Sequence, residues 1–101
     1  MYCYYHCYLV DALRQKDKHF EVYIDGGIRK GTDVLKVIAM GAKMAFIGRP
    51  AIWGLAYNGK EGVLKTLDIL RKELDSVMAL SGNTDLINIG KDLILTPKSL
   101  Y

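Results

Sequence analysis

The sequence predicts an α/β fold in which two parallel strands and two helices alternate in the order β-α-β-α, as one quarter of a (β/α)8 TIM barrel. Two short apolar runs, 21–24 and 44–47, each end in a glycine-containing turn, and each is followed by a helical pattern. Parallel strands need helical crossovers, which places both strands in one sheet with the helices outside. A whole barrel takes about 250 residues, and this chain has 101. We therefore expect a piece that is incomplete on its own, with exposed apolar strand edges and marginal stability.

The first strand is predicted at 21–24, a β-branched and aromatic run that is too short for a helix and stops at two glycines. Upstream of it, residues 9–15 have the pattern of the end of a helix. After the glycines a second helix is expected, with Thr32 as its N-cap and Gly41 at its end. Its apolar face consists of Val34, Leu35, Ile38, Ala39 and Ala42.

The second strand is predicted at 44–47, where Gly48 and Arg49 follow it directly. Pro50 fits the first turn of a short helix, because that position needs no N–H donor. Asn58 and Gly59 are expected to break this helix.

A long amphipathic helix is predicted from about residue 60 to residue 80. Its apolar positions recur at spacings of four and three residues: Val63, Leu67, Leu70, Leu74 and Val77. Thr84 or Asp85 is expected to cap one or two further turns that reach Ile89. The last eleven residues are expected to form a tail.

The composition excludes several classes of protein. With 50% apolar and 25% charged residues, the chain is typical of a globular protein with a core. The net charge of +3 is spread among acids without a basic stripe, so no nucleic-acid partner is expected. No apolar run approaches the roughly 20 residues of a membrane span, since Lys43 and Arg49 interrupt the longest one. No membrane partner is expected either.

Residues 1–8 form an atypical N-terminal segment that lacks the features of a secretory signal. Cys3, His6 and Cys7 lie in this segment, and His19 is the only further residue of these two types. A structural zinc site needs four well-placed ligands. We therefore expect no metal site.

The two glycine-arginine turns have the pattern of a phosphate-binding site. Gly26 and Gly27 permit positive φ, the helix that follows each strand offers unpaired N–H groups, and an arginine supplies a charged donor fork. Loops after the last two strands bind phosphate in many (β/α)8 barrels. Without the arginines and the second turn, Gly26 and Gly27 would more simply be interpreted as an ordinary turn with no ligand. The candidate binding residues are Asp25, Gly26, Gly27, Ile28, Arg29, Gly48 and Arg49.

Three longer stretches carry a resemblance to a known family: EVYIDGGIRKGTDVLK (21–36), GAKMAFIGRP (41–50) and WGLA (53–56). They resemble the C-terminal segment of the FMN-dependent 2-hydroxy-acid oxidases, the glycolate oxidase family, and MALSG (78–82) continues the likeness. The resemblance covers roughly 9–95 and implies the C-terminal βαβα quarter of an FMN hydroxy acid dehydrogenase barrel domain, followed by a tail at 96–101.

The resemblance implies that FMN is the cofactor and that the candidate residues hold its phosphate and ribityl chain. The N–H groups of Gly27, Gly48 and Arg49 would then face phosphate oxygens, and Arg29 and Arg49 would add charge-assisted bonds. Asp25 would bond the ribityl chain or orient an arginine. Trp53 is expected to pack against neighbouring elements or a subunit.

The family oxidises (S)-2-hydroxy acids to 2-oxo acids and reduces O2 to H2O2. Its histidine base stands in a His-Gly-x-Arg-Gln motif, which this chain lacks, and His6 and His19 have other neighbours. No catalytic residue is therefore assigned, the chain alone is expected to be inactive, and the small 2-hydroxy acid would bind only in a complete barrel. The alternatives are a non-catalytic FMN-binding, phosphate-binding or interaction fragment, a truncated product without a stable fold, and part of another phosphate-binding TIM-barrel enzyme.

The resemblance also implies a homo-oligomer and a peroxisomal location. Members of the family often end in a Ser-Lys-Leu-like tripeptide. This chain ends in Ser99-Leu100-Tyr101, which lacks the basic middle residue. A cytoplasmic location is the alternative.

Overall fold

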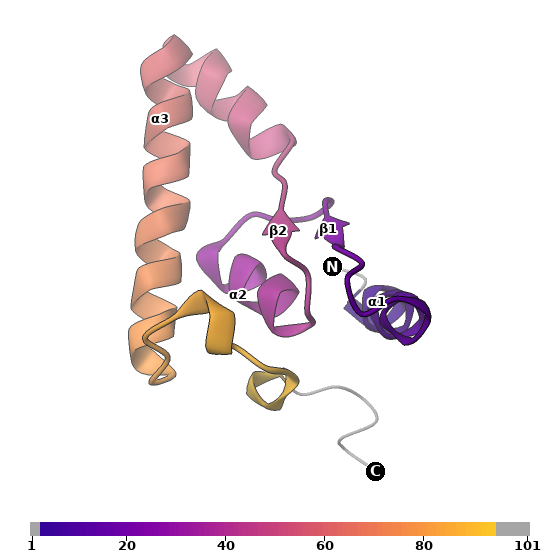
Figure 1. Cartoon of the computed structure of the whole chain (residues 1–101). Coiled ribbons are helices and arrows are strands. Elements are labelled where there is room, and N and C mark those ends of the chain that lie inside the picture. The colour runs from indigo at the N-terminus through magenta and orange to yellow at the C-terminus, as the bar shows by residue number, and fades with distance from the viewer. Residues whose placement is uncertain (1–2, 95–101) are drawn as a thin grey trace.

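The computed structural model describes residues 3–94, with side chains from residue 9 onward. The predicted β-α-β-α order is present, preceded by one further helix (Figure 1). The helix expected at 9–15 is part of a longer helix that begins at Cys3. The elements are α1 (Cys3–Lys16), β1 (Tyr23–Ile24), α2 (Gly31–Ala39), β2 (Met44–Ala45), α3 (Arg49–Leu80) and the 3-10 turns η1 (Leu86–Asn88) and η2 (Lys91–Leu93).

The two strands form a parallel pair, in the register Tyr23 to Met44 and Ile24 to Ala45. One further bond extends the ladder beyond β2, where the N–H of Phe46 donates to the carbonyl of Ile24 at 2.8 Å. Each strand is two residues long, shorter than the predicted four, and each has a single neighbour among the described residues. The α2 crossover links them on one side of the pair.

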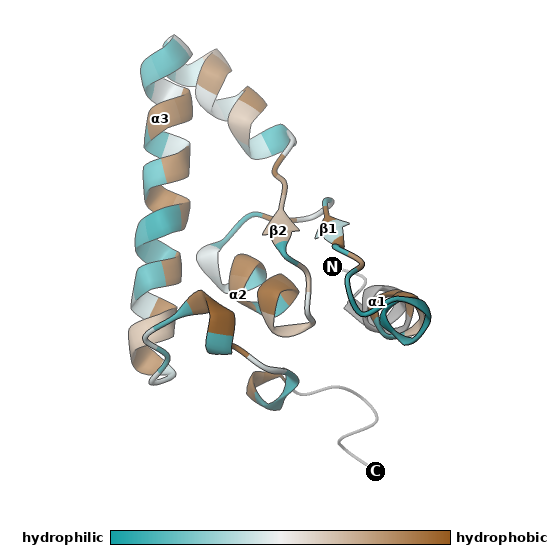
Figure 2. Cartoon of the chain, in the orientation of Figure 1, coloured by the Kyte–Doolittle hydropathy of each residue, from teal (hydrophilic) through white to brown (hydrophobic). Residues whose placement is uncertain are grey.

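The main core lies between α1, the strand pair and α2. Figure 2 shows that α2 is the most hydrophobic of the helices and that α3 alternates between hydrophobic and hydrophilic residues. Val37 and Met40 are almost fully buried, and Val10 brings α1 into the same cluster. The buried members are Val10, Val22, Ile24, Ile28, Val37, Met40 and Ala42.

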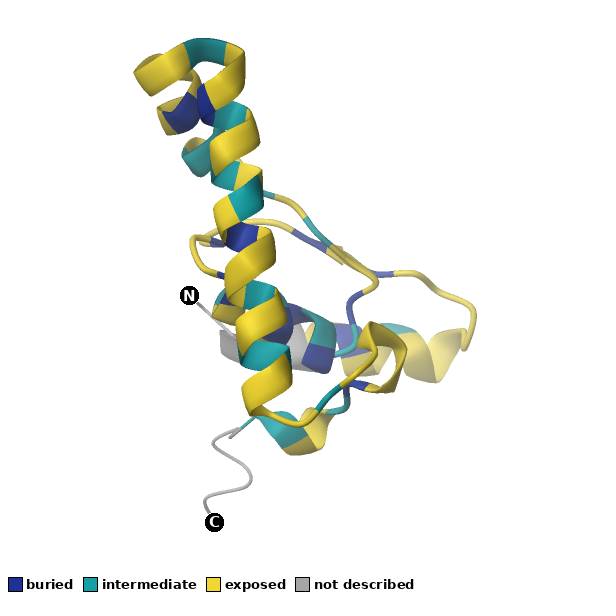
Figure 3. Cartoon of the chain, turned by 90° about the vertical axis from the view of Figure 1, so that its left-hand side faces the viewer, coloured by how far each residue is buried: buried dark blue, intermediate teal, exposed yellow. Residues whose placement is uncertain are grey.

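A second cluster joins α2 to α3 and to the segment after it. Leu35 and Ala39 of α2 pack with Ile89, and Leu74 and Val77 of α3 lie partly buried against them. Only the later part of the predicted apolar face of α3 takes part, since Leu67 is 48% exposed. Figure 3 shows exposed residues along much of α3.

The long helix α3 is bent where the sequence predicted a break. Asn58 (φ −151°, ψ 34°) and Gly59 (φ 57°) are non-helical and separate a first half from a second half. Gly54 and Gly62 pack against each other across the bend, and a Cβ on Gly62 would lie 1.8 Å from the carbonyl oxygen of Gly54. The two halves therefore meet backbone to backbone, an arrangement that depends on glycine at both positions.

The chain remains ordered beyond α3 for longer than expected. The Asp85 carboxylate accepts the N–H of Ile87 at 3.1 Å, so the predicted cap is confirmed on a 3-10 turn, η1. The tail predicted from residue 91 is wrong at its start, because η2 forms there and Leu93 packs onto the second cluster. The tail at 96–101 lies outside the described residues.

One side of the strand pair is exposed. Tyr23, Met44 and Phe46 each keep about half of their surface exposed, at 52%, 48% and 48%. The rings of Tyr23 and Phe46 meet edge to face, with centroids 6.1 Å apart. The strand pair therefore exposes one apolar face.

None of the described helices is long and apolar enough to cross a membrane. Within the described side chains, no group of three or more His, Cys, Asp or Glu residues is placed to hold a metal ion. The side chains of Cys3, His6 and Cys7 lie outside that part of the structure.

We expect the pair formed by Glu21 and Lys43 to give stability a small pH dependence. The Lys43 ammonium, helped by the Tyr23 hydroxyl, which donates at 2.6 Å, holds the pKa of Glu21 below its ordinary value. The Glu21 carboxylate raises the pKa of Lys43. The contribution of the Glu21 carboxylate to folding stability is complete above the ordinary carboxyl pKa and is lost as pH falls through the lowered pKa. The contribution of the Lys43 ammonium to folding stability is complete below the ordinary lysine pKa and is lost as pH rises through the raised pKa.

Thermal melts of Glu21→Gln and the wild type at neutral and acid pH test this dependence. The variant should be slightly less stable at neutral pH and should lose less melting temperature on acidification, with the small difference typical of an exposed pair. Parallel losses in the two proteins would contradict the expectation.

Candidate functional site

The structure brings the two predicted turns together at one end of the strand pair. Both turns follow the carboxyl ends of parallel strands, and they line one pocket of about 360 Å³. All seven candidate residues belong to its lining: Asp25, Gly26, Gly27, Ile28, Arg29, Gly48 and Arg49. The other lining residues are Phe46, Ile47, Pro50, Ile52 and Trp53.

The turn after β1 depends on its glycines for backbone conformation. Gly26 has φ of +95° and Gly27 has φ of +72°, in the left-handed region that other residues rarely adopt. A Cβ on Gly26 would meet no atom within 4 Å, so steric space does not explain that glycine. Within residues 3–94, the N–H groups of both glycines donate to no backbone carbonyl. They are therefore available to a ligand.

The turn after β2 leads directly into the N-terminus of α3. Gly48 is the residue before the helix, and a Cβ there would also meet no atom within 4 Å. Its carbonyl accepts the N–H of Ala51 at 3.1 Å, whereas the N–H groups of Gly48 and Arg49 have no backbone acceptor in the described chain. The first turn of α3 contains no acidic residue. The partial positive charge of this helix end is therefore open to an anion.

The N-terminus of α2 differs from the sequence prediction. Thr32 is not its N-cap, because the helix begins at Gly31 and Lys30 takes the cap position. The Asp33 carboxylate accepts the N–H groups of Arg29 and Lys30, both at 3.2 Å. Glu73 of α3 accepts the N–H of Gly31 at 2.7 Å. The expectation that both helices offer unpaired N–H groups is therefore wrong for Gly31 of α2, because a carboxylate already accepts its N–H.

The charged side chains around the pocket are exposed. Asp25, Arg29 and Arg49 all lie at the surface, where the arginine forks can reach a ligand. In the described part of the chain, the ion pairs do not include Asp25. Ile28 is only 2% exposed and packs in the main core, which leaves its backbone for any ligand contact.

The sequence reasoning missed the apolar wall of the pocket. Phe46 and Ile47 precede the second turn, and Ile52 and Trp53 lie on the first turns of α3. Trp53, which was expected to pack against neighbouring elements or a subunit, is 55% exposed in this chain and borders the pocket. Their positions in the sequence, shortly before and after the Gly-Arg-Pro turn, could have indicated that they lie beside the pocket.

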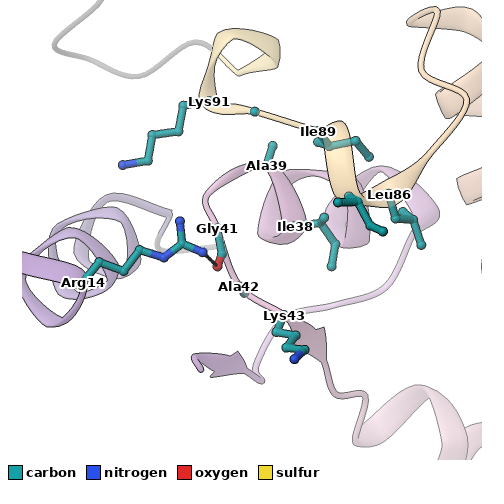
Figure 4. Close-up of a pocket in the computed structure, with 11 residues that line it drawn as sticks. Arg14, Ile38, Ala39, Gly41, Ala42, Lys43, Leu86, Ile89 and Lys91 are labelled. Atoms are coloured by element: carbon teal, nitrogen blue, oxygen red, sulfur yellow. Dashed lines mark hydrogen bonds between the residues drawn. The ribbon is translucent and has the colours of Figure 1, made fainter. Parts of the chain in front are cut away.

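A second pocket of about 520 Å³ lies at the opposite end of β2 (Figure 4). Arg14 of α1 donates to the carbonyl of Gly41 at 2.8 Å, where Gly41 has φ of +102° and ends α2 as predicted. The other two basic residues that line this pocket form ion pairs, Lys43 with Glu21 and Lys91 with Asp11. These contacts tie α1, α2 and η2 together, and we assign this pocket a structural role.

Comparison with known proteins identifies the family. The sequence model of the FMN-dependent dehydrogenase family matches residues 7–96, and the chain belongs to that family. Among curated proteins, it is 52% identical over 89 residues to 2-hydroxyacid oxidase 2 of Mus musculus, covering 84% of this chain and 25% of that protein. It is 50% identical over 86 residues to 2-hydroxyacid oxidase 1 of Homo sapiens, covering 85% and 22%. The resemblance to 2-hydroxy-acid oxidases is thereby confirmed.

Solved structures agree with this assignment. The flavin-binding domain of baker's yeast flavocytochrome b2 matches with a TM-score of 0.82 at 38% identity, covering 87% of this chain and 23% of that one. A mandelate oxidase structure matches with a TM-score of 0.72 at 40% identity, covering 80% and 24%. The chain thus spans about a quarter of the length of the relatives it matches. The match favours this family over another phosphate-binding barrel.

Proposed function

We propose that the chain is the FMN-binding C-terminal portion of an (S)-2-hydroxy-acid oxidase. It would form the C-terminal βαβα quarter of a (β/α)8 barrel that converts 2-hydroxy acids to 2-oxo acids and reduces O2 to H2O2. One observation carries the proposal: the two glycine-arginine turns line one pocket at the carboxyl ends of two parallel strands. That position is where such barrels hold phosphate groups.

The pocket has the chemistry that a phosphate needs. The free N–H groups of Gly48 and Arg49 stand at the start of α3, and those of Gly26 and Gly27 lie on the facing turn. The exposed guanidinium groups of Arg29 and Arg49 would neutralise the phosphate charge. The open space beside both turns admits a bulky group. FMN, when bound, would supply the redox chemistry by accepting two electrons from the substrate.

The residues of this chain bind and orient, and we assign none of them to proton transfer. His19 precedes β1, whereas the pocket follows it, so this imidazole lies at the other end of the strand. The backbone N–H of His19 donates to the Asp17 carboxylate at 2.8 Å in a local turn. A substrate base and the substrate pocket would come from the rest of a complete barrel. The chain alone would therefore be inactive.

The remaining features of the proposal follow the family. Residues 9–95 would belong to the barrel domain, with 1–8 as an atypical segment and 96–101 as a tail. A homo-oligomer and a peroxisomal location are proposed by family likeness, with a cytoplasmic location as the alternative. A non-catalytic interaction fragment is the second candidate function, favoured by the exposed side chains of Tyr23, Met44 and Phe46.

Arg49→Ala is expected to weaken FMN binding at least about tenfold, because a charge-assisted donor at the phosphate is lost. The full chain is incubated with FMN and desalted, and the retained flavin absorbance is measured. Trp53 is the only tryptophan and borders the pocket, so quenching of its fluorescence during an FMN titration gives an independent affinity.

Arg71→Ala is the matched control, because Arg71 is an exposed arginine on the second half of α3 and does not line the pocket. It should retain FMN as the wild type does. If the wild type retains no flavin and its Trp53 fluorescence ignores FMN, the proposed binding function of this chain is wrong.

A further inference from the structure

A hydrogen bond between distant segments holds the start of α2. The Glu73 carboxylate, on the second half of α3, accepts the N–H of Gly31 at 2.7 Å across 42 positions of sequence. Gly31 is buried, and its N–H has no backbone acceptor among the described residues. The Glu73 oxygen is therefore the group that satisfies this donor.

The close approach of the two helices is specific to this point. A Cβ on Gly31 would lie 2.3 Å from the backbone nitrogen of Leu74 and 2.5 Å from the carbonyl carbon of Glu73. Only a residue without a side chain lets α3 come this near. The Glu73 carboxylate can therefore accept the N–H of Gly31, because the backbones of α2 and α3 are in contact at this point.

The bond lies next to the turn that follows β1. Gly31 comes two residues after Arg29, and Asp33 binds the N–H groups of Arg29 and Lys30 at 3.2 Å each. Three consecutive N–H groups are therefore held by two carboxylates. The ladder with β2 fixes the other end of the turn, at Ile24.

We propose that Glu73 is a positioning residue that fixes the conformation of the turn at 25–30 from outside the pocket. Its side chain does not line the pocket. This inference rests on the proposed function only in taking FMN as the ligand of the pocket.

Amide hydrogen exchange of the full chain, read by NMR, tests the positioning without any ligand. In the wild type the Gly31 amide should be protected although no backbone group accepts its N–H. Glu73→Met keeps the length of the side chain but removes the acceptor, and exchange at Arg29, Lys30 and Gly31 should accelerate about tenfold. Glu73→Gln retains an acceptor oxygen and should restore protection. Exchange at Val37, in the middle of α2, should stay unchanged in both variants.

Asp75→Ala is the control, an exposed acid on the same helix that makes no described contact with the turn. If the wild-type Gly31 amide exchanges at the rate of an unprotected chain, or if Glu73→Gln exchanges as fast as Glu73→Met, the proposal is overturned. The measurement of the wild-type Gly31 amide decides the first of these outcomes even if Glu73→Met does not fold.

FMN affinity of the same proteins then separates the two proposals. Glu73→Met should bind FMN at least about fivefold more weakly, and Glu73→Gln should bind it like the wild type. Equal affinity of all three proteins would overturn the role of Glu73 at the site. Absence of FMN binding in the wild type would overturn the proposed function and leave the exchange result to decide on the turn.

Discussion

Replacement of Gly62 by alanine is expected to destabilise the protein by about 2 to 3 kcal/mol, because overpacking outweighs the higher helix propensity of alanine. The new Cβ would lie 1.8 Å from the carbonyl oxygen of Gly54, which is backbone and cannot rotate away. The two halves of α3 must then separate. Urea unfolding followed by circular dichroism measures the change in the free energy of unfolding.

Glu61→Ala serves as the control for Gly62→Ala, because residue 61 is exposed on the same helix. Its free energy of unfolding should change by less than about 0.5 kcal/mol. A Gly62→Ala protein as stable as this control would show that the two halves of α3 do not touch at Gly54.

Gly31→Ala is expected to cost about 3 kcal/mol, because the methyl group would overlap the backbone of α3 at Glu73 and Leu74. Relief of that overlap moves α3 away from α2. The movement opens the second cluster, in which Leu35 and Ala39 pack against Leu74. The midpoint of thermal unfolding should fall by more than about 10 °C for a domain of this size.

Thr32→Ala is a sharp comparison for Gly31→Ala. If Thr32 were the N-cap, its loss would cost about 1 kcal/mol. The structure instead places Lys30 at the cap and leaves Thr32 exposed within the first turn of α2. We therefore expect a change below about 0.5 kcal/mol, measured by the same melt. A large loss would contradict the cap assignment.

Much of the fold was predictable because its signals are local. The apolar runs before each glycine turn predicted the strands, and the four-and-three spacing around Leu70 and Leu74 predicted α3. Asn58 and Gly59 predicted the bend, and Gly41 the end of α2, from their backbone preferences alone. The site residues were predictable because parallel strands end at the same edge of a sheet.

The rest depended on contacts between distant residues. Nothing near Gly31 in the sequence indicates that Glu73, 42 positions away, accepts its N–H. Lys30, not Thr32, takes the cap position of α2, and the Asp33 carboxylate accepts two backbone N–H groups of the preceding turn. The contact of Gly54 with Gly62 likewise follows from the angle of the bend rather than from either residue.

The bend in α3 also connects the two sides of the pocket along the chain. The first half of α3 starts at the turn after β2, and Glu73 of the second half accepts the N–H of Gly31, at the start of α2. Gly54 and Gly62 pack against each other, so a backbone contact helps to set the angle between these two halves. Neither glycine lines the pocket. The spacing of the two turns that line it therefore depends on a backbone contact that lies outside the site.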